Sequence, residues 1–516
     1  MTTTHLPSNP ENYFDFVIVG GGTAGCVIAS RLSDYLPNKK VLLIEAGPSD
    51  FMDNRVLLLK DWLNLLGGEL DYDYGTTEQP MGNSHIRHSR AKVLGGCSSH
   101  NTLISFRPFE YDCKRWEAQG CKGWSFKTFM RVLDNIRNSV QPVHERHRNQ
   151  LCIDWIDSCS TAMDIPVIHD FNKEIKSKGA LKQGVGFFSV SYNPDNGHRS
   201  SASVAYIHPI LRGDEKRPNL TVLTNAWVSK VNVKGEKVTG INVTLQDGSK
   251  HILNSKAETI LCAGAVDTPR LMLLSGLGPK QQLEELNIPV VKNLPGVGEN
   301  LLDHPETIIM WELNKPVPAN QTTMDSDAGI FLRREAPDAN NGDGDIADIM
   351  MHCYQIPFCL NTSRNHKLIR KTTPALDFRY FTDPEGYDAA TIVAGFKAAR
   401  KIAQQAPFSD WIKREVAPGP KVTSDEQLSE YGRRAAHTVY HPAGTTKMGD
   451  VSKDEFAVVD HQLKVKGLQG IRIADAGVFP EMPTINPMLT VLAIGERAAE
   501  MIAEAHGWKG MERQKL

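Results

Sequence analysis

The chain has 516 residues, of which 41% are hydrophobic and 23% are charged, and its formal net charge is −2. This length and composition are typical of a globular enzyme with two or three domains. The near-neutral charge and the lack of a long basic block argue against nucleic-acid binding. No run reaches the ~18 apolar residues of a membrane span, and the polar N-terminus lacks a signal-peptide pattern.

The nine cysteines are odd in number and form neither a CxxC pair nor a Cys/His cluster. A disulfide framework or a metal site is therefore not expected, and a reducing compartment such as the cytoplasm fits the sequence. The last three residues, Gln514-Lys515-Leu516, resemble the Ser-Lys-Leu peroxisomal address except in the first residue. A peroxisomal location is the alternative.

The first predicted elements form a βαβ unit. Residues Phe14–Val19 and Val41–Ile44 are short apolar runs that predict buried parallel strands. Between them lie a glycine turn, Gly20–Gly25, and a segment with helical spacing, Cys26–Leu36. This order is typical of a dinucleotide-binding unit.

The turn carries the pattern Gly20-x-Gly22-x-x-Gly25, and Glu45 follows 20 positions later, after the second strand. Gly20 permits the tight turn, Gly22 lets the backbone approach a pyrophosphate, and Gly25 lets helix and strand pack closely. The helix N-terminus attracts the phosphates, and Glu45 can accept hydrogen bonds from ribose hydroxyls. The pattern predicts a dinucleotide but leaves FAD and NAD open.

The middle of the chain is predicted to form strands, and helices are predicted towards its end. Strands are predicted at 219–223, 228–233, 238–245, 251–253 and 259–262. Helices are predicted at 388–406 and 490–504, and residues 334–344, rich in Asp, Asn, Gly and Pro, predict a surface loop.

Four further motifs follow one another along the chain. They are Ala91-Lys92-Val93-Leu94-Gly95-Gly96-Cys97-Ser98-Ser99-His100-Asn101, Gly264-Ala265-x-x-Thr268-Pro269 continuing to Gly278, His441-Pro442-Ala443-Gly444-Thr445, and Ala474-Asp475-Ala476 with Thr484-Ile485-Asn486-Pro487. In these motifs the chain resembles the glucose–methanol–choline oxidoreductases, and within them the choline-oxidising members. The resemblance covers nearly the whole chain.

The resemblance implies an α/β fold in two domains. A discontinuous, Rossmann-like FAD-binding domain would comprise residues 13–50, 88–120, 196–303 and 437–516. An α+β substrate-binding domain with an antiparallel sheet would comprise residues 51–87, 121–195 and 304–436. The possible oligomer is a homodimer.

FAD is the cofactor that the resemblance implies. Glu45 and the backbone of Val228 would contact its adenosine end, and Asp475 its pyrophosphate or ribityl region. Small residues allow close approach of the backbone to a flat ring or a phosphate. The other cofactor residues are Gly20, Gly22, Gly25, Gly95, Gly96, Ser99, Asn101, Gly264, Asn486, Pro487 and Met488. We expect the segment 264–278 to be a loop.

His100 stands where most relatives have an apolar residue and where choline-oxidising relatives have a histidine bonded to the flavin. The resemblance implies the same covalent link here. The alternative is a histidine that only packs beside the ring.

Oxidation of an alcohol removes the hydroxyl proton and transfers a hydride from the carbon to the flavin. Histidine suits the base because its unperturbed pKa is about 6.5. The resemblance assigns His441 and Asn486 to the substrate oxygen and His352 to stabilisation of the alkoxide. Of the histidines, we favour His441 as the base.

A quaternary ammonium substrate has no hydrogen to donate, so a carboxylate and aromatic faces would bind it. Glu306, Trp62, Tyr440 and Phe358 match such a pocket, and Thr102 stands where choline-oxidising relatives have serine. Two departures weaken this interpretation. An aromatic pair is replaced around Met324-Asp325-Ser326, and the chain is much shorter than its relatives between Asn361 and Pro374.

The sequence leaves the electron acceptor open. An oxidase would reduce oxygen to peroxide, and a dehydrogenase of the same fold would use a quinone or another acceptor. A flavin-binding protein without turnover is a further alternative, and a nicotinamide dehydrogenase is a more distant one.

Overall fold

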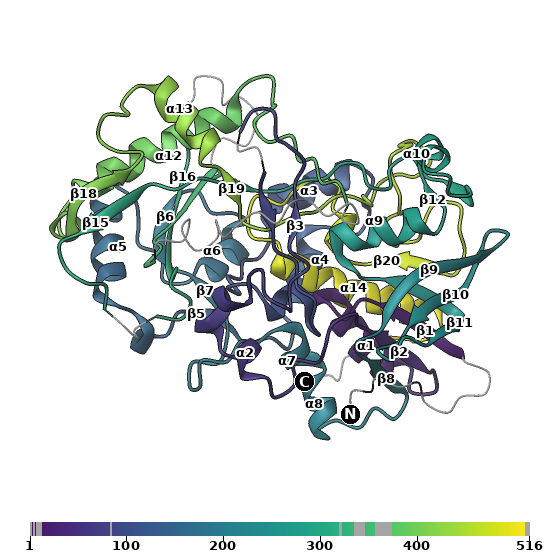
Figure 1. Ribbon diagram of the computed structural model, residues 1–516. Helices are drawn as coiled ribbons and strands as arrows, with labels where there is room; N and C mark the ends of the chain where they lie inside the picture. The colour runs from purple at the N-terminus through teal and green to yellow at the C-terminus, as the bar shows by residue number, and fades with distance from the viewer. Residues whose placement is uncertain are drawn as a thin grey trace.

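The computed structural model describes residues 3, 6, 13–82, 85–318, 322–334, 346–356 and 374–510. One large sheet with its helices lies at one end of the molecule, and several smaller sheets with α5, α12 and α13 lie at the other (Figure 1). The two-part α/β architecture agrees with the predicted fold class. The domain limits themselves stay a prediction.

The N-terminal βαβ unit is confirmed as β1 (Tyr13–Val19), α1 (Thr23–Tyr35) and β2 (Val41–Ile44). Strands β1 and β2 pair in parallel, and all four residues of β2 are buried. The helix begins three residues earlier than predicted because Gly22 already serves as its N-cap in an extended conformation.

The unit belongs to a seven-stranded sheet with the order β8-β2-β1-β11-β10-β9, in which β20 also pairs with β11. Strand β11 pairs in parallel with β1 and β20 and antiparallel with β10. The sheet therefore joins a parallel nucleotide-binding half to an antiparallel extension. The added strands are β8 (Leu220–Leu223), β9 (Trp227–Lys234), β10 (Lys237–Thr244), β11 (Lys250–Leu261) and β20 (Ile471–Ile473).

Two sequence predictions in this half are wrong. Residues 250–261 form one strand instead of two, because the polar residues Asn254, Ser255 and Lys256 alternate between exposed and buried positions without a turn. The expected loop after this strand is mostly a helix, α9 (Gly264–Leu274), with Pro269 inside it. Its buried apolar residues include Leu271 and Met272, which pack in the main core.

At two positions of the first turn only glycine fits, because a side chain would collide with neighbouring backbone atoms. Gly20 has a φ of +105°, and a Cβ there would lie 2.4 Å from the carbonyl oxygen of Cys262. A Cβ on Gly25 would lie 2.0 Å from the carbonyl oxygen of Gly20. The helix therefore packs directly on the turn backbone, as predicted for a nucleotide-binding unit.

The other half of the described structure contains two separate antiparallel sheets beside shorter two-stranded pairs. One has the order β17-β16-β6, and the other is the pair β15-β18. Their strands are β6 (Gly184–Phe187), β15 (Met310–Leu313), β16 (Ala328–Leu332), β17 (Ile349–His352) and β18 (Ile412–Ala417). The accompanying helices are α5 (Gln150–Met163), α12 (Tyr387–Ala403) and α13 (Asp425–Arg434). Helix α12 confirms the helix predicted at 388–406.

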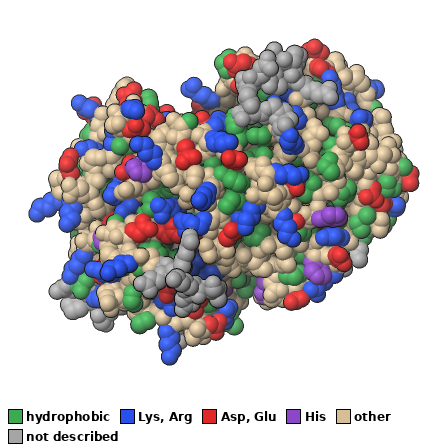
Figure 2. All heavy atoms as spheres, turned by 180° about the vertical axis from the view of Figure 1, so that it is seen from behind, with side chains coloured by type: hydrophobic (Ala, Val, Ile, Leu, Met, Phe, Trp, Pro, Cys, Tyr) green, Lys and Arg blue, Asp and Glu red, His purple; other side chains and the backbone are tan. Residues whose placement is uncertain are grey.

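The C-terminal helix α14 (Met488–Ala505) confirms the helix predicted at 490–504 and packs on α1. Among helices formed by described residues, none is long and apolar enough to cross a bilayer. On the face drawn in Figure 2, basic and acidic side chains are interspersed, and neither sign covers a continuous area. The predicted loop at 334–344, the segment 361–373 and the C-terminal Gln514-Lys515-Leu516 lie mostly or wholly outside the described residues.

We predict that Gly25→Ala separates α1 from the turn, because its Cβ has no space. The free energy of unfolding should fall by at least about 1–3 kcal/mol, the usual range for overpacking, and bound dinucleotide should decrease. Thermal melting and cofactor absorbance per chain measure both effects. Gly68→Ala is the control, since its Cβ lies 3.4 Å from its nearest neighbour. Equal cofactor content in the two variants would contradict the packing role of Gly25.

Candidate active site

A single elongated cavity runs from the first glycine turn to the smaller sheets. It encloses about 2050 Å³ of space without protein atoms, its open part included. Most residues predicted for the cofactor and the substrate line it: Gly20, Gly22, Glu45, Trp62, Gly96, His100, Asn101, Thr102, Val228, Gly264, Glu306, His352, Tyr440, His441, Asp475, Asn486, Pro487 and Met488. Residues from distant parts of the chain therefore meet around one space.

Three predicted cofactor residues lie behind the cavity wall instead. Gly25 packs on Gly20, as described above. Gly95 has a φ of +89° and leads into the 3₁₀ turn η2 (Gly96–Ser99). The hydroxyl of Ser99 donates to the carbonyl oxygen of Leu94 at 2.9 Å, inside the fold. These residues support the wall from behind, and their contact with the cofactor stays a prediction. Phe358 lies outside the described residues.

Three helices begin at the cavity. The first residues of α1, α9 and α14 line it, and in each of these described helices the N-cap residue makes no side-chain hydrogen bond. The free N–H groups of a helix N-terminus carry partial positive charge and bind anions. The cavity therefore fits an extended anionic ligand such as a dinucleotide.

Glu45 holds the turn from the opposite side. Its Oε2 accepts from the Gly21 N–H at 2.9 Å, and its Oε1 accepts from the Gly47 N–H at 2.8 Å. Burial raises its pKa to about 7, although both hydrogen bonds favour the carboxylate. Each carboxylate oxygen keeps a lone pair for a ribose hydroxyl.

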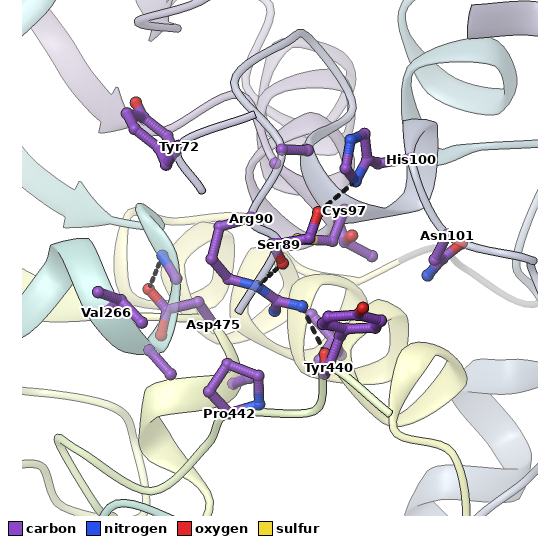
Figure 3. Close-up of a pocket in the computed structure, with 18 of the residues that line it drawn as sticks. Tyr72, Ser89, Arg90, Cys97, His100, Asn101, Val266, Tyr440, Pro442 and Asp475 are labelled. Atoms are coloured by element: carbon purple, nitrogen blue, oxygen red, sulfur yellow. Dashed lines mark hydrogen bonds between the residues drawn. The ribbon is translucent and has the colours of Figure 1, made fainter. Parts of the chain in front are cut away.

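Asp475 fixes the start of α9. One oxygen accepts from the N–H of Gly264 at 2.9 Å and from the hydroxyl of Thr268 at 2.6 Å, and the other accepts from the N–H of Gly477 at 2.7 Å. Figure 3 shows Asp475 among the residues that line the cavity. The carboxylate thereby positions the helix N-terminus that faces the ligand.

His100 lies in the wall with 3% of its surface exposed. Its Nε2 lies 3.0 Å from the carbonyl oxygen of Leu65, and its Nδ1 lies 3.3 Å from the hydroxyl oxygen of Ser89. That hydroxyl donates to Asp71 at 2.6 Å, so it offers His100 an acceptor (Figure 3). Both ring nitrogens therefore face acceptors, and a neutral imidazole can satisfy only one of them.

His441 is paired with His304, and their Nδ1 atoms lie 3.0 Å apart. His304 also donates a hydrogen bond to the carbonyl oxygen of Pro483. Burial lowers the pKa of His304 to about 4 and that of His441 well below its ordinary value, so both rings are neutral. A neutral ring has one N–H, so the His304 Nδ1 accepts from His441. The lone pair of His441 then lies on Nε2.

Asp303 holds the backbone on which His441 sits. Its Oδ1 accepts from the His441 N–H at 2.8 Å, and its Oδ2 accepts from the hydroxyls of Thr438 and Tyr380. Burial raises its pKa to about 6, against the effect of these bonds. Asp303 is therefore a positioning residue for His441.

Arg90 brings a positive charge to the same end of the cavity. Its guanidinium donates to the backbone carbonyl of Tyr440, a residue with a φ of +64° (Figure 3). After burial and the neighbouring His304, the charge of Arg90 is a further cause of the low pKa of His441. A negative charge developing beside His441 would be stabilised there.

His352 ends β17 and lines the same cavity. Its Nδ1 lies 3.0 Å from the hydroxyl of Ser326, and burial lowers its pKa to about 4. At the position where the sequence replaces an aromatic pair of its relatives, Ser326 lines the cavity and Asp325 does not. The carbonyl of Met324 accepts from the Trp62 indole at 2.9 Å. Asp325 therefore supplies no second anion to the wall.

Glu306 lies at the far end, where β14 (Pro305–Glu306) pairs with β19 (His437–Thr438). Its Oε1 lies 3.1 Å from the Nε2 of His437, and its Oε2 accepts from the Tyr354 hydroxyl at 3.4 Å. Burial, and then the nearby Asp303, raise its pKa to about 8. Trp62, Tyr354 and Tyr440 place aromatic rings on the same cavity wall.

Sequence reasoning missed Arg90, Asp303, His304 and Tyr354. Tyr354 follows His352 by two residues, a spacing that returns a strand side chain to the same face. Asp303 and His304 lie three and two residues before Glu306, so their closeness to a predicted substrate residue was the signal available. Arg90 precedes the glycine-rich motif and has no such signal.

Comparison with known proteins agrees with this geometry. Two family models described as GMC oxidoreductase match residues 14–306 and 365–495. The chain belongs to the GMC oxidoreductase family. Its cofactor is therefore FAD, and its reaction is the oxidation of an alcohol.

The chain is 38% identical to choline oxidase of Arthrobacter globiformis, covering 98% of this chain and 97% of that protein. It is 33% identical to an oxygen-dependent choline dehydrogenase of Staphylococcus saprophyticus, covering 95% and 94%. It is 31% identical to an alcohol dehydrogenase [acceptor] of Pseudomonas putida, covering 95% of each chain. The structure of pyridoxine 4-oxidase from Mesorbium loti shares the fold, with a TM-score of 0.82, 24% identity and coverage of 94% and 98%.

Proposed function

We propose that this GMC oxidoreductase oxidises a primary alcohol that carries a quaternary ammonium group, with oxygen as the electron acceptor. The main support is that one cavity is lined by both a neutral His441 and the buried carboxyl group of Glu306. The first group can take a proton from the alcohol, and the second can bind the cation.

His441 is proposed as the base. Its Nδ1–H donates to His304, so its Nε2 can accept the hydroxyl proton. The low pKa produced by burial keeps Nε2 unprotonated at neutral pH. Bound FAD supplies the acceptor for the hydride. His441 would then be a cation, and the ring of His304, as acceptor, would share that charge.

Asn486, His352 and Arg90 are proposed to stabilise the alkoxide. Asn486 has an amide donor, and His352 is held by Ser326. The Arg90 guanidinium contributes a full positive charge at this end of the cavity. Donors that are fixed before reaction lower the free energy of the charged transition state. Thr102 offers a hydroxyl on the same wall.

Glu306 is proposed to bind the ammonium group, together with the rings of Trp62, Tyr354 and Tyr440. Its pKa of about 8 means that the carboxyl group is mostly protonated at neutral pH without a ligand. A bound cation favours the carboxylate and expels the proton. The two named choline-oxidising relatives support this substrate class.

Oxygen is favoured as acceptor by the names of these same relatives, an oxidase and an oxygen-dependent dehydrogenase. A quinone or another acceptor is the alternative, and stoichiometric peroxide under air separates the two. The cytoplasmic location and the homodimer stay predictions from the sequence.

We also propose that His100 is bonded covalently to the flavin. His100 lines the cavity and is almost fully buried. The link would hold the cofactor permanently.

We predict that His441→Ala slows flavin bleaching by choline under anaerobic conditions by roughly 10²–10⁴-fold, because the alcohol proton has no acceptor. Stopped-flow absorbance of the flavin measures the rate. His169→Ala, at an exposed position, is the control and should bleach at the unchanged rate. A His441→Ala rate near that of the control would exclude His441 as the base.

We predict that kcat/KM for choline rises with pH by about tenfold between pH 7 and 9, as Glu306 ionises around its pKa of about 8. The neutral isostere 3,3-dimethylbutan-1-ol should show no rise in this range, because His441 is already unprotonated. Glu306→Gln should flatten the choline profile at a lower value. Parallel profiles for the two alcohols would assign the ionisation to another group.

We predict that acid denaturation of the purified protein leaves the yellow colour in the pellet, because the flavin is bonded to His100. His100→Asn should release its flavin into the supernatant under the same conditions. Absorbance of the two fractions is the measurement. Release of flavin from the unaltered protein would show that His100 only packs beside the ring.

A further inference from the structure

A second cavity adjoins the first at the ammonium end. It encloses about 1830 Å³ without protein atoms, its open part included, and so is nearly as large as the active-site cavity. Three side chains line both spaces: Glu306, His352 and Tyr354. The group proposed to bind the ammonium ion therefore stands where the cavities meet.

The second cavity lies between the two separate antiparallel sheets. Among the described strands, β15 pairs with β18 and β17 pairs with β16, and residues of β15 and β17 both line the gap. Helix α12 lines it as well, and there Gly395 leaves room: an added Cβ would meet only Ile349, at 3.8 Å. The split in the sheet thus provides a space instead of a packed core.

The described lining of this space is mainly apolar. It includes Trp155, Ile309, Trp311, Met351, Phe396 and Ile402. Such a surface gains free energy by binding an apolar group and offers little to a polar one. Near Glu306, by contrast, the carboxyl group and the Tyr354 hydroxyl favour a charge. The ligand that fits both regions has a cationic centre followed by an apolar arm.

We propose that the substrate is an amphiphilic quaternary ammonium alcohol. Its hydroxyethyl group would point to His441, its ammonium group would lie at Glu306, and an apolar N-substituent would occupy the second cavity. This inference rests on the proposed function. It adds that the substrate carries an apolar N-substituent beside its hydroxyethyl and ammonium groups.

The test is a series of N-alkyl-N,N-dimethyl-N-(2-hydroxyethyl)ammonium ions, from methyl (choline itself) to octyl, with the flavin-loaded enzyme. We expect kcat/KM to rise by up to about threefold for each of the first methylene groups, as each is transferred from water to an apolar wall. The rise should come mainly from a lower KM, because the arm is remote from the reacting atoms.

Gly395→Leu fills the second cavity from α12 without touching the active-site cavity. It should abolish the gain from long arms and leave choline turnover unchanged. Ala390→Leu, at an exposed position of the same helix, is the control and should keep the full gain. Binding of alkyltrimethylammonium ions, which have no hydroxyl, is measured by calorimetry on the same proteins, so the chain-length effect is read without turnover.

A chain-length dependence that is flat or falling in both turnover and binding overturns the inference while choline oxidation stands. The same holds if Gly395→Leu keeps the full gain. If no alcohol of the series reduces the flavin, the proposed function fails. In that case affinity that rises with chain length and is lost in Gly395→Leu still supports an amphiphilic ammonium ligand.

Discussion

The position of one proton, between the Nδ1 atoms of two buried imidazoles, determines the chemistry of the cavity. His304 uses its own N–H on the carbonyl of Pro483, so the shared proton belongs to His441, and the Nε2 of His441 is left as a base. The reverse tautomer would present a donor there. Burial enforces this state, because it keeps both rings neutral, and the hydrogen bonds of Asp303 hold the backbone of His441 in register. The proposed base is thus prepared before the substrate binds.

The substrate region of the cavity contains two groups of opposite charge preference. In the substrate region the guanidinium of Arg90 acts on His441, and the carboxyl group of Glu306 is buried beside His437. A buried carboxyl group without a cation is unfavourable as an anion and waits in its protonated form. The binding free energy of a cationic alcohol therefore includes the cost of removing the proton from the carboxyl group. Such an arrangement discriminates against neutral alcohols of the same shape once the carboxyl group is ionised, because only a cationic alcohol pairs with the carboxylate.

Local patterns in the sequence predicted the elements whose formation depends on interactions between residues close together in the chain. The turn at Gly20–Gly25, its flanking strands and the terminal helix were found because glycine spacing and apolar periodicity are short-range signals. Strand β11 was divided in the prediction because its polar residues at 254–256 resemble a turn, whereas in the sheet they alternate between exposed and buried positions. Of the cavity-wall residues, the motifs contain His441 and Asn486, and the family resemblance supplied Glu306. The tautomer of His441 depends on His304 and Pro483, and the charge of Arg90 arrives from another segment, so neither was readable from spacing.

Three helices begin at the same cavity, and this has a consequence for the protein without its cofactor. The N-termini of α1, α9 and α14 direct partial positive charges at one space, and such charges repel one another when no anion lies between them. A ligand that binds only the folded state shifts the unfolding equilibrium by mass action. Folding and cofactor loading are therefore coupled, and binding of the diphosphate raises the free energy of unfolding. Small polyanions, by occupying the same charges, would act as temporary substitutes during maturation.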